Sequence, residues 1–205
     1  MAPKVAVVKY GVGNIFSIVS GLRRAGAEPV VVDCVNDPGL WDGVVLPGVG
    51  AYAAAAERLH RCAWGIRDAL SMGAQLLGIC LGLQLLFEES REAGEHSFGL
   101  GLLSGRVEKL VAPKLPHVGW SRVYPREGGC RLLEGVREGE FFYYVHSYAY
   151  MYVDAPWVCG VSRYGLSEFA AVVEAPPVYA TQFHPERSSR PGLRVLQNWV
   201  KLLKR

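Results

Sequence analysis

The chain has 205 residues, half of them hydrophobic and a fifth charged, so it has ample apolar residues for a buried core. Its formal charge of +3 at pH 7 is too small to favour nucleic acid as a partner. No apolar run approaches the roughly 18 residues that a membrane span needs, and the N-terminal residues lack the pattern of a signal peptide. The sequence therefore predicts a soluble, cytoplasmic protein that forms one domain over residues 1–205.

The first hundred residues alternate apolar runs with helical patterns. Residues 4–9 are expected to form a strand, followed by a turn at 11–14 in which Asn14 caps a helix that extends through Leu22. Further buried strands and helices are expected downstream. The strands are 29–33, 43–46 and 75–79, and the helices are 52–70 and 81–90. This alternation predicts parallel βαβ units with helices on both faces of a sheet.

From about residue 105 the chain changes to short aromatic and β-branched runs that are broken by glycine and proline. Such runs predict antiparallel strands added to the sheet. They are 118–124, 140–144, 157–164 and 168–174. Residues 178–183 are expected to form a strand that returns to the site, and a last helix begins near Ser188 with Pro191 in its first turn. The predicted fold is α/β: an open mixed, mostly parallel sheet flanked by helices, with antiparallel strands in the second half.

Five cysteines are spread along the chain: Cys34, Cys62, Cys80, Cys130 and Cys159. An odd number leaves at least one thiol free in a monomer. No pair has the CxxC spacing of a zinc site, so neither a metal nor a cofactor is expected. We expect all of them except Cys80 to be small, buried hydrophobic residues. The spacing leaves open whether any of these four are paired.

The sharpest chemical feature is Gly78-Ile79-Cys80-Leu81-Gly82, which matches the G-x-S-x-G elbow with sulfur in place of oxygen. It lies where a buried strand is expected to meet a helix, whose N-terminus favours a thiolate. The flanking glycines allow the tight turn that exposes the central side chain. The motif predicts Cys80 as a nucleophile, although a packed strand–helix turn would also suit these residues.

A second feature, Gln182-Phe183-His184-Pro185-Glu186, follows at the end of another apolar run. Pro185 favours an extended conformation at His184, and in an extended chain Glu186 points to the same side as His184. A carboxylate there fixes the imidazole tautomer and stabilises its protonated form. The motif predicts His184 as a base oriented by Glu186; the alternative is an exposed loop with an incidental histidine.

A third feature is the glycine-rich turn Leu46-Pro47-Gly48-Val49-Gly50. Acyl transfer needs N–H donors where negative charge develops on the attacked carbonyl oxygen, and the amides of Val49 or Gly50 and of Leu81 are candidates for this oxyanion hole. Each of the three features lies at the C-terminal end of a predicted strand, where open α/β sheets place their sites. Nucleophile, oriented base and oxyanion donors together predict an acyl-transfer site.

These motifs, P-G-x-G, G-x-C-x-G-x-Q and H-P-E, occur in this order, with Gln84 completing the second. They resemble the signatures of the triad (class I) glutamine amidotransferases, and the resemblance covers nearly the whole chain. It implies that L-glutamine is hydrolysed to glutamate and ammonia. It also implies that Gly48, Gln84 and main-chain groups of His146, Ser147 and Tyr148 hold the substrate.

Two further stretches, Pro116-His117-Val118-Gly119-Trp120 and Val145-His146-Ser147-Tyr148, resemble the glutaminase subunit of imidazole glycerol phosphate synthase. This resemblance implies a heterodimer with a (βα)₈-barrel cyclase that receives the ammonia for histidine biosynthesis. It also implies that glutaminase activity stays low until the cyclase is occupied, which would make the Gly48-Val49-Gly50 loop a switch.

By family position, the docking face would hold four residues: Asn14, Trp120, Tyr143 and Arg187. Two residues depart from the pattern often found in the family. Lys9 stands where the family often has Asp, and Ser121 stands where it often has Asn. Neither belongs to the catalytic motifs, so we expect both to affect packing near the partner rather than the chemistry.

Three other functions explain fewer of these residues. A glutaminase subunit of another synthase, such as pyridoxal 5′-phosphate synthase, would not account for the Pro-His-x-Gly-Trp stretch. A cysteine peptidase on the same scaffold would leave Gln84 and the Pro-Gly-Val-Gly turn unexplained. A non-catalytic amidotransferase-like scaffold would not require Cys80, His184 and Glu186 to be intact.

Overall fold

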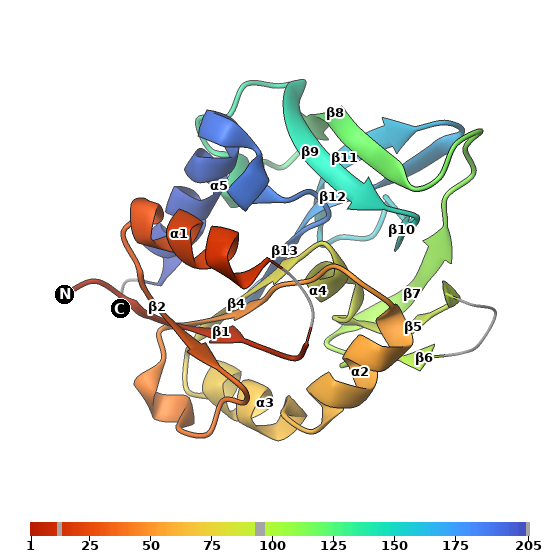
Figure 1. Ribbon diagram of the computed structural model, residues 1–205. Helices are drawn as coiled ribbons and strands as arrows, with labels where there is room; N and C mark the ends of the chain where they lie inside the picture. Colours follow the sequence, from red (N-terminus) through yellow and green to blue (C-terminus); the bar gives the residue numbers. More distant parts are fainter. Residues whose placement is uncertain (12–13, 93–96, 204–205) are drawn as a thin grey trace.

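The parallel half of the main sheet is built by the first part of the chain and one late strand. The computed structural model describes residues 1–11, 14–92 and 97–203 (Figure 1). Five neighbouring strands pair in parallel. In spatial order they are β2 (Glu28–Val32), β1 (Lys4–Val8), β3 (Gly43–Leu46), β4 (Gln75–Ile79) and β13 (Val178–Thr181).

Four antiparallel strands extend this sheet to nine within the described residues. They are β12 (Ser167–Ala175), β11 (Val158–Tyr164), β8 (His117–Pro125) and β9 (Glu140–His146). The expected mixed sheet with antiparallel strands in the second half is therefore confirmed, with strand ends that differ from the prediction by at most two residues. The assignment of the whole chain to one domain stays a prediction.

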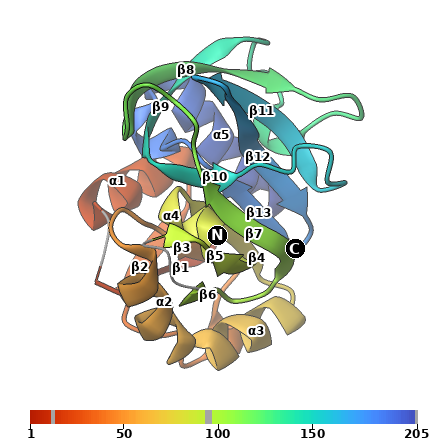
Figure 2. The same ribbon diagram turned by 90° about the vertical axis from the view of Figure 1, so that its right-hand side faces the viewer.

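Both faces of the four inner parallel strands, β1, β3, β4 and β13, are buried, whereas the edge strand β2 is partly exposed. Alternate residues of β1 enter different cores: Val5 and Val7 pack in one, and Ala6 and Val8 in the other. Two helices cover each face, on opposite sides of the sheet in Figures 1 and 2. They are α1 (Ile15–Ala25) with α5 (Ser189–Leu202), and α2 (Tyr52–His60) with α3 (Ala63–Ser71). Burial on both faces explains why these strands read as continuous apolar runs rather than as alternating patterns.

The caps of α1 agree with the sequence. The Asn14 side chain accepts a hydrogen bond from the Ser17 amide at 3.2 Å, which satisfies one free N–H of the first turn. Gly26 ends the helix in the left-handed conformation, with φ of 99°. The predicted cap at Asn14 is confirmed, whereas two residues of the predicted turn, 12 and 13, lie outside the described residues.

The single helix predicted over residues 52–70 is wrong, because the chain bends between α2 and α3. The Cys62 amide donates to the Leu59 carbonyl at 2.9 Å, which closes a tight turn after α2. The bend brings α3 against the segment at Val35, so closely that a Cβ on Gly65 would overlap the Val35 carbonyl. A helix continued straight from α2 would not make this contact.

The helix predicted over residues 81–90 is wrong beyond its first turn. Helix α4 (Leu81–Gln84) is followed directly by strand β5 (Phe87–Ser90). Residues 81–87 are all buried, so they have no solvent-facing side by which a helical period could be recognised. A short, wholly apolar run does not distinguish a helix from a strand by periodicity, and here the chain uses both.

A small second sheet was not expected from the sequence. Its order is β10 (Tyr148–Tyr150), β7 (Leu103–Lys109), β5 and β6 (Ser97–Phe98). These strands are short, and β5 pairs with β7 in parallel while the outer pairs are antiparallel. Three short 3₁₀ turns complete the described elements: η1 (Pro38–Leu40), η3 (Arg131–Leu133) and η4 (Pro185–Arg187). None of the helices in the described ranges is long and apolar enough to cross a membrane.

The four cysteines other than Cys80 form two disulfides, so they are not the small hydrophobic thiols that were expected, and the pairing that the spacing left open is resolved. Cys34 pairs with Cys62, and Cys130 pairs with Cys159, with Cα–Cα distances of 5.1 and 5.2 Å. Both distances are normal for a disulfide. The partners lie 28 and 29 residues apart in the chain, so only the fold brings them together. Cys80 is the free cysteine.

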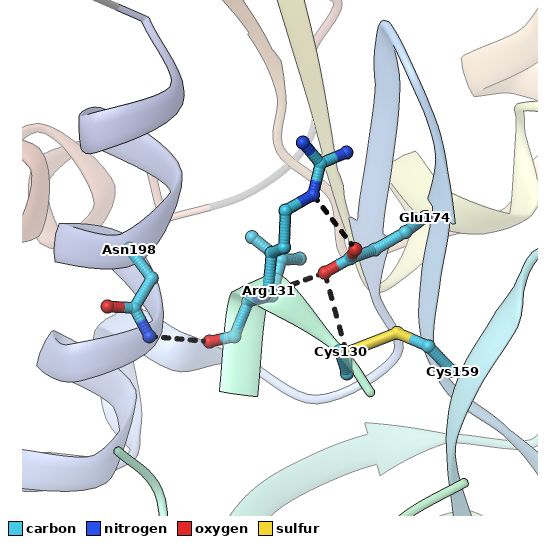
Figure 3. Close-up of a disulfide and its surroundings, with 6 residues drawn as sticks. Cys130, Arg131, Cys159, Glu174 and Asn198 are labelled. Atoms are coloured by element: carbon cyan, nitrogen blue, oxygen red, sulfur yellow. Dashed lines mark hydrogen bonds and ion pairs between the residues drawn. A yellow bond between two sulfur atoms is a disulfide. The ribbon is translucent and has the colours of Figure 1, made fainter. Parts of the chain in front are cut away.

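The Cys130–Cys159 bridge lies beside a clamp on η3 (Figure 3). Glu174 of β12 accepts from the Leu132 amide at 2.6 Å, and Asn198 of α5 donates to the Leu132 carbonyl at 3.0 Å. The turn is therefore held from β12 on one side and from α5 on the other. Together with the bridge, these bonds attach the segment before β9 to the main sheet.

The pairing predicts a thiol count. Titration of the unfolded, unreduced protein should find one thiol per chain, and five after reduction. Each bridge closes a loop of about 30 residues, so Cys159→Ser should lower the free energy of unfolding by about 3–4 kcal/mol in a urea titration. The double variant Cys130→Ser/Cys159→Ser should lose no more than the single one. Five thiols before reduction would contradict the pairing.

Candidate active site

Cys80 stands on a sharp turn between β4 and α4. Its backbone has φ of 54° and ψ of −108°, and residues other than glycine rarely adopt a positive φ. The turn is anchored at both ends of the residue. The Cys80 amide donates to the Thr181 carbonyl of β13 at 2.8 Å, and the Cys80 carbonyl accepts from the Gln84 amide at 3.2 Å. These bonds hold a strained conformation of the kind found at functional sites.

The two glycines of the motif are required sterically. A Cβ on Gly82 would overlap the Leu46 carbonyl of β3, and a Cβ on Gly78 would lie 2.7 Å from the Gly82 carbonyl oxygen. The spacing therefore reflects how closely this turn approaches its neighbours. Because α4 has only four residues, its dipole supports a thiolate less than a full helix would.

His184 and Glu186 form a buried pair at the end of β13. Their side chains are 3% and 2% exposed, and Nδ1 of His184 lies 2.8 Å from Oε1 of Glu186. A carboxylate oxygen only accepts, so Nδ1 carries the proton and Nε2 is left for the nucleophile. Nε2 interacts with Cys80, although among the described residues no hydrogen bond of normal geometry reaches it. The structure thus brings together the three residues that were predicted to act together.

The charges around His184 favour its protonated form. Burial opposes a charged imidazole, but attraction to Cys80 close by, followed by the hydrogen bond to Glu186, raises the pKa of His184 to about 10. At neutral pH the His184 ring is therefore charged, and it places a positive group beside the Cys80 side chain.

A cavity of about 200 Å³ opens beside Cys80. Its wall includes Gln84 and the segment 145–148, which contain most of the predicted substrate residues. Val49, Gly50 and Leu81 also lie on it, whereas Gly48 is not part of the wall. Figure 2 shows β9 leading into β10 above α4, the path by which residues 146–148 reach the nucleophile. Substrate binding by these residues stays a prediction.

Gln182 was not given a role by the sequence analysis, although it precedes His184 by two residues. It is fully buried, and its Nε2 donates to Sγ of Cys80 at 3.6 Å. Gln84 donates through its own Nε2 to the Tyr148 carbonyl at 2.7 Å and to Oε1 of Gln182 at 3.3 Å. A signal was present in the sequence: residues two apart in an extended chain point to the same side, so Gln182 and His184 could both have been expected to face Cys80.

One of the predicted oxyanion donors, the Leu81 amide, is already occupied in this conformation. The Leu81 amide donates to the Gly48 carbonyl oxygen at 3.4 Å, and its N–H is therefore not available to a substrate. The preceding carbonyl, of Pro47, accepts from the hydroxyl of Tyr10. Gly50 has φ of 131°, which favours glycine. The role of Val49, Gly50 and Leu81 as oxyanion donors stays a prediction.

Three of the four residues predicted for docking form a cluster. Trp120 is 51% exposed and packs edge-on against Tyr143, with ring centroids 5.9 Å apart. The Arg187 guanidinium lies 4.7 Å from the centroid of the Tyr143 ring. Asn14 is exposed at the start of α1 and is occupied by its capping bond. Their part in an interface stays a prediction.

Two other features stand apart from this site. A larger cavity of about 710 Å³ lies by the small sheet and is lined by aromatic residues that include Tyr150 and Trp157, but by none of the predicted site residues. A group of potential metal ligands, Cys130, Cys159 and Glu174, has its ligand atoms within 4.8 Å of one another. The two sulfurs are joined in a disulfide, so they offer no thiolate to a metal.

Comparison with known proteins agrees with this geometry. The sequence profile of "Glutamine amidotransferase class-I" matches residues 6–202, nearly the whole chain. The chain belongs to the class I glutamine amidotransferase family. It is therefore a glutamine amidotransferase, as its motifs predicted.

Similar proteins of this family carry the name "Imidazole glycerol phosphate synthase subunit HisH". The protein of Moorella thermoacetica is 43% identical over 98% of this chain and 95% of its own length. That of a Synechococcus species is 40% identical over 100% of this chain and 96% of its own. Among solved structures, PurLQS from Thermotoga maritima has a TM-score of 0.79 at 22% identity, covering 100% of both chains. At that identity the structure supports the fold alone.

Because His184 lies beside Cys80, we expect the pKa of His184 to change when Cys80 is replaced. In Cys80→Ser the thiolate is lost, so the pKa of His184 should fall, because burial then acts with less opposition. An NMR pH titration of the imidazole resonances measures this fall, with exposed His60 as internal reference. An unchanged titration midpoint for His184 would show that the two side chains do not interact.

Proposed function

We propose that this chain is the glutaminase subunit of an imidazole glycerol phosphate synthase and that it supplies ammonia for histidine biosynthesis. The observation that carries the proposal is the buried His184–Glu186 pair beside Cys80, in a chain 43% identical over 98% of its length to such a subunit. The residue roles that follow are part of this proposal. Glutamine hydrolysis at this site requires no group beyond the chain's own side chains and main-chain amides.

In the proposed reaction, Cys80 gives its proton to Nε2 of His184, and the thiolate attacks the side-chain amide carbon of glutamine. Nε2 then returns the proton to the departing nitrogen, which leaves as ammonia, and a glutamyl thioester remains on Cys80. Water attacks the thioester with His184 as base and releases glutamate. Glu186 fixes the tautomer of His184 and stabilises its charged form throughout. Gln84 and residues 146–148 would hold the substrate.

The Gly48–Val49 peptide would act as a switch. Its carbonyl accepts from the Leu81 amide, so its N–H, on Val49, points the opposite way. Rotation of this one peptide would remove the carbonyl from Leu81 and aim the Val49 N–H in its place. Two donors would then face the tetrahedral oxyanion, where the present conformation places an acceptor.

The partner in this proposal is a (βα)₈-barrel cyclase subunit, bound as a heterodimer in the cytoplasm, with ammonia passing directly between the sites. The exposed Trp120 and its neighbours Tyr143 and Arg187 support a docking face there. The His184 amide donates to the Tyr143 carbonyl at 2.9 Å, so this face adjoins the catalytic pair directly. Binding of the cyclase at Tyr143 could therefore shift His184 directly, through the hydrogen bond between the two residues.

Glutamate release from glutamine tests the function. The purified chain alone should be slow, and addition of the cyclase with its nucleotide substrate should stimulate it strongly. Cys80→Ser should abolish release in both conditions while circular dichroism shows an unchanged fold. If the cyclase does not change the rate, the chain is still a glutaminase but the proposed partner is wrong. If Cys80→Ser retains turnover, Cys80 is not the nucleophile.

The switch has its own test at Val49. Val49→Pro has no N–H to offer, so stimulated glutamate release should fall by about 100- to 1000-fold, the usual effect of losing one oxyanion donor. Val49→Ala keeps the N–H and serves as the matched control. Equal stimulated rates in the two variants would exclude Val49 as a donor.

A further inference from the structure

A second set of buried polar groups adjoins the substrate cavity, and its hydrogen bonds have no part in the bond-breaking steps proposed above. His117 of β8 and His146 of β9 face each other, with 3.1 Å between Nδ1 of His117 and Nε2 of His146. The other nitrogen of His146 lies 2.9 Å from the Tyr148 carbonyl, and the other nitrogen of His117 lies 2.9 Å from the hydroxyl of Ser121. All four imidazole nitrogens thus have a partner.

The direction of these bonds follows from the charge state of the rings. Burial lowers the pKa of His117 to about 4 and that of His146 to about 3, so both are neutral at pH 7. The Tyr148 carbonyl only accepts, so His146 carries its proton on Nδ1. Nε2 of His146 therefore accepts from Nδ1–H of His117, and Nε2 of His117 accepts from the Ser121 hydroxyl. Every donor in the series points toward Tyr148.

The series continues from Tyr148 to the nucleophile. The Tyr148 carbonyl also accepts from Nε2 of Gln84 at 2.7 Å, and the same nitrogen donates to Oε1 of Gln182 at 3.3 Å. Because Oε1 of Gln182 is then an acceptor, its amide nitrogen is the group that faces Cys80, where it donates to Sγ at 3.6 Å. Each side-chain amide has its orientation set by the bond before it.

The outer end of the series lies on the strand that carries Trp120, one of the residues predicted for docking. Ser121 follows Trp120 on β8 with its side chain on the opposite face of the strand, whereas Trp120 is half exposed and packs against Tyr143. The ring of His117 is itself held in place, because it stacks between Tyr144 and Tyr164 with centroid distances of 4.9 and 3.9 Å. A rigid ring between two hydrogen bonds transmits a displacement at one end to the other.

We propose that this series, from Ser121 through His117, His146, Tyr148, Gln84 and Gln182 to Cys80, is a relay that orients the Gln182 amide toward the nucleophile. His117 is its central positioning residue. The outer end of the relay rests on the proposed function, since only that function identifies the surface at Trp120 as a docking face. The inner end does not, because a donor to Sγ favours the thiolate whatever the partner.

A pair of variants at His117 tests the relay. His117→Phe keeps a flat ring between the two tyrosines but has no nitrogen, whereas His117→Asn keeps an N–H near the position of Nδ1. Alkylation by iodoacetamide without reductant measures the nucleophile alone, because Cys80 is the free cysteine. In His117→Phe the alkylation rate at pH 7 should fall about five- to tenfold and its pH profile should move to higher pH, the effect of one misplaced hydrogen bond. His117→Asn should retain the wild-type profile.

Nitrogen-15 NMR of the unmodified protein provides an independent measurement. Both His117 and His146 should carry their proton on Nδ1 at pH 7, and a proton on Nε2 of either ring would overturn the relay. A wild-type alkylation profile in a folded His117→Phe variant would overturn it as well. If that variant does not fold, Ser121→Ala replaces it, with the same shift expected. Neither readout uses glutamine turnover, so a failure of the relay is distinguishable from a failure of the proposed function.

Discussion

The close approach of one turn to its neighbouring strands is the constraint on which the site depends. The turn after β4 fits between the ends of β3 and β13 because Gly78 and Gly82 have no side chains, and Cys80 is anchored there to Thr181. This contact fixes the nucleophile relative to β13, whose next residues carry Gln182, His184 and Glu186. One steric condition therefore sets the position of the sulfur and of the groups that surround it.

Three buried histidines illustrate how partners decide the charge of a group. His117, His146 and His184 are all almost inaccessible to solvent, and burial opposes a charge on each of them. Only His184 has anionic neighbours, Cys80 and Glu186, and only its pKa is raised. The other two face a neutral ring, a hydroxyl or a carbonyl, and they stay uncharged. The same residue type thus supplies a proton carrier in one place and fixed hydrogen bonds in the other.

The parts of the molecule that could be predicted from sequence are those encoded by local chemistry. The glycines around Cys80, the proline between His184 and Glu186 and the cap at Asn14 each impose a geometry within a few residues. What could not be predicted depends on contacts between distant segments. The bend at Cys62 follows from the packing of α3 near Val35. Strand β10 forms because it pairs with β7, which lies about 40 residues earlier in the chain, and the disulfide partners meet only in the folded chain. The contact of Gln182 with sulfur likewise needs the turn at Cys80 to be in place.

The two disulfides and the free cysteine place opposite demands on the surrounding redox conditions. In its proposed role Cys80 must be a reduced thiol, whereas the bridges at Cys34–Cys62 and Cys130–Cys159 persist only where reduction is weak. The Cys130–Cys159 bridge adjoins the clamp on the segment that leads into β9, and β9 carries Tyr143 and His146. Protein produced in a strongly reducing cytosol, or stored with excess thiol to protect the nucleophile, would therefore differ in covalent structure from the bridged form. Activities measured on such preparations would describe a molecule with a looser attachment between the surface at Trp120 and Tyr143 and its core.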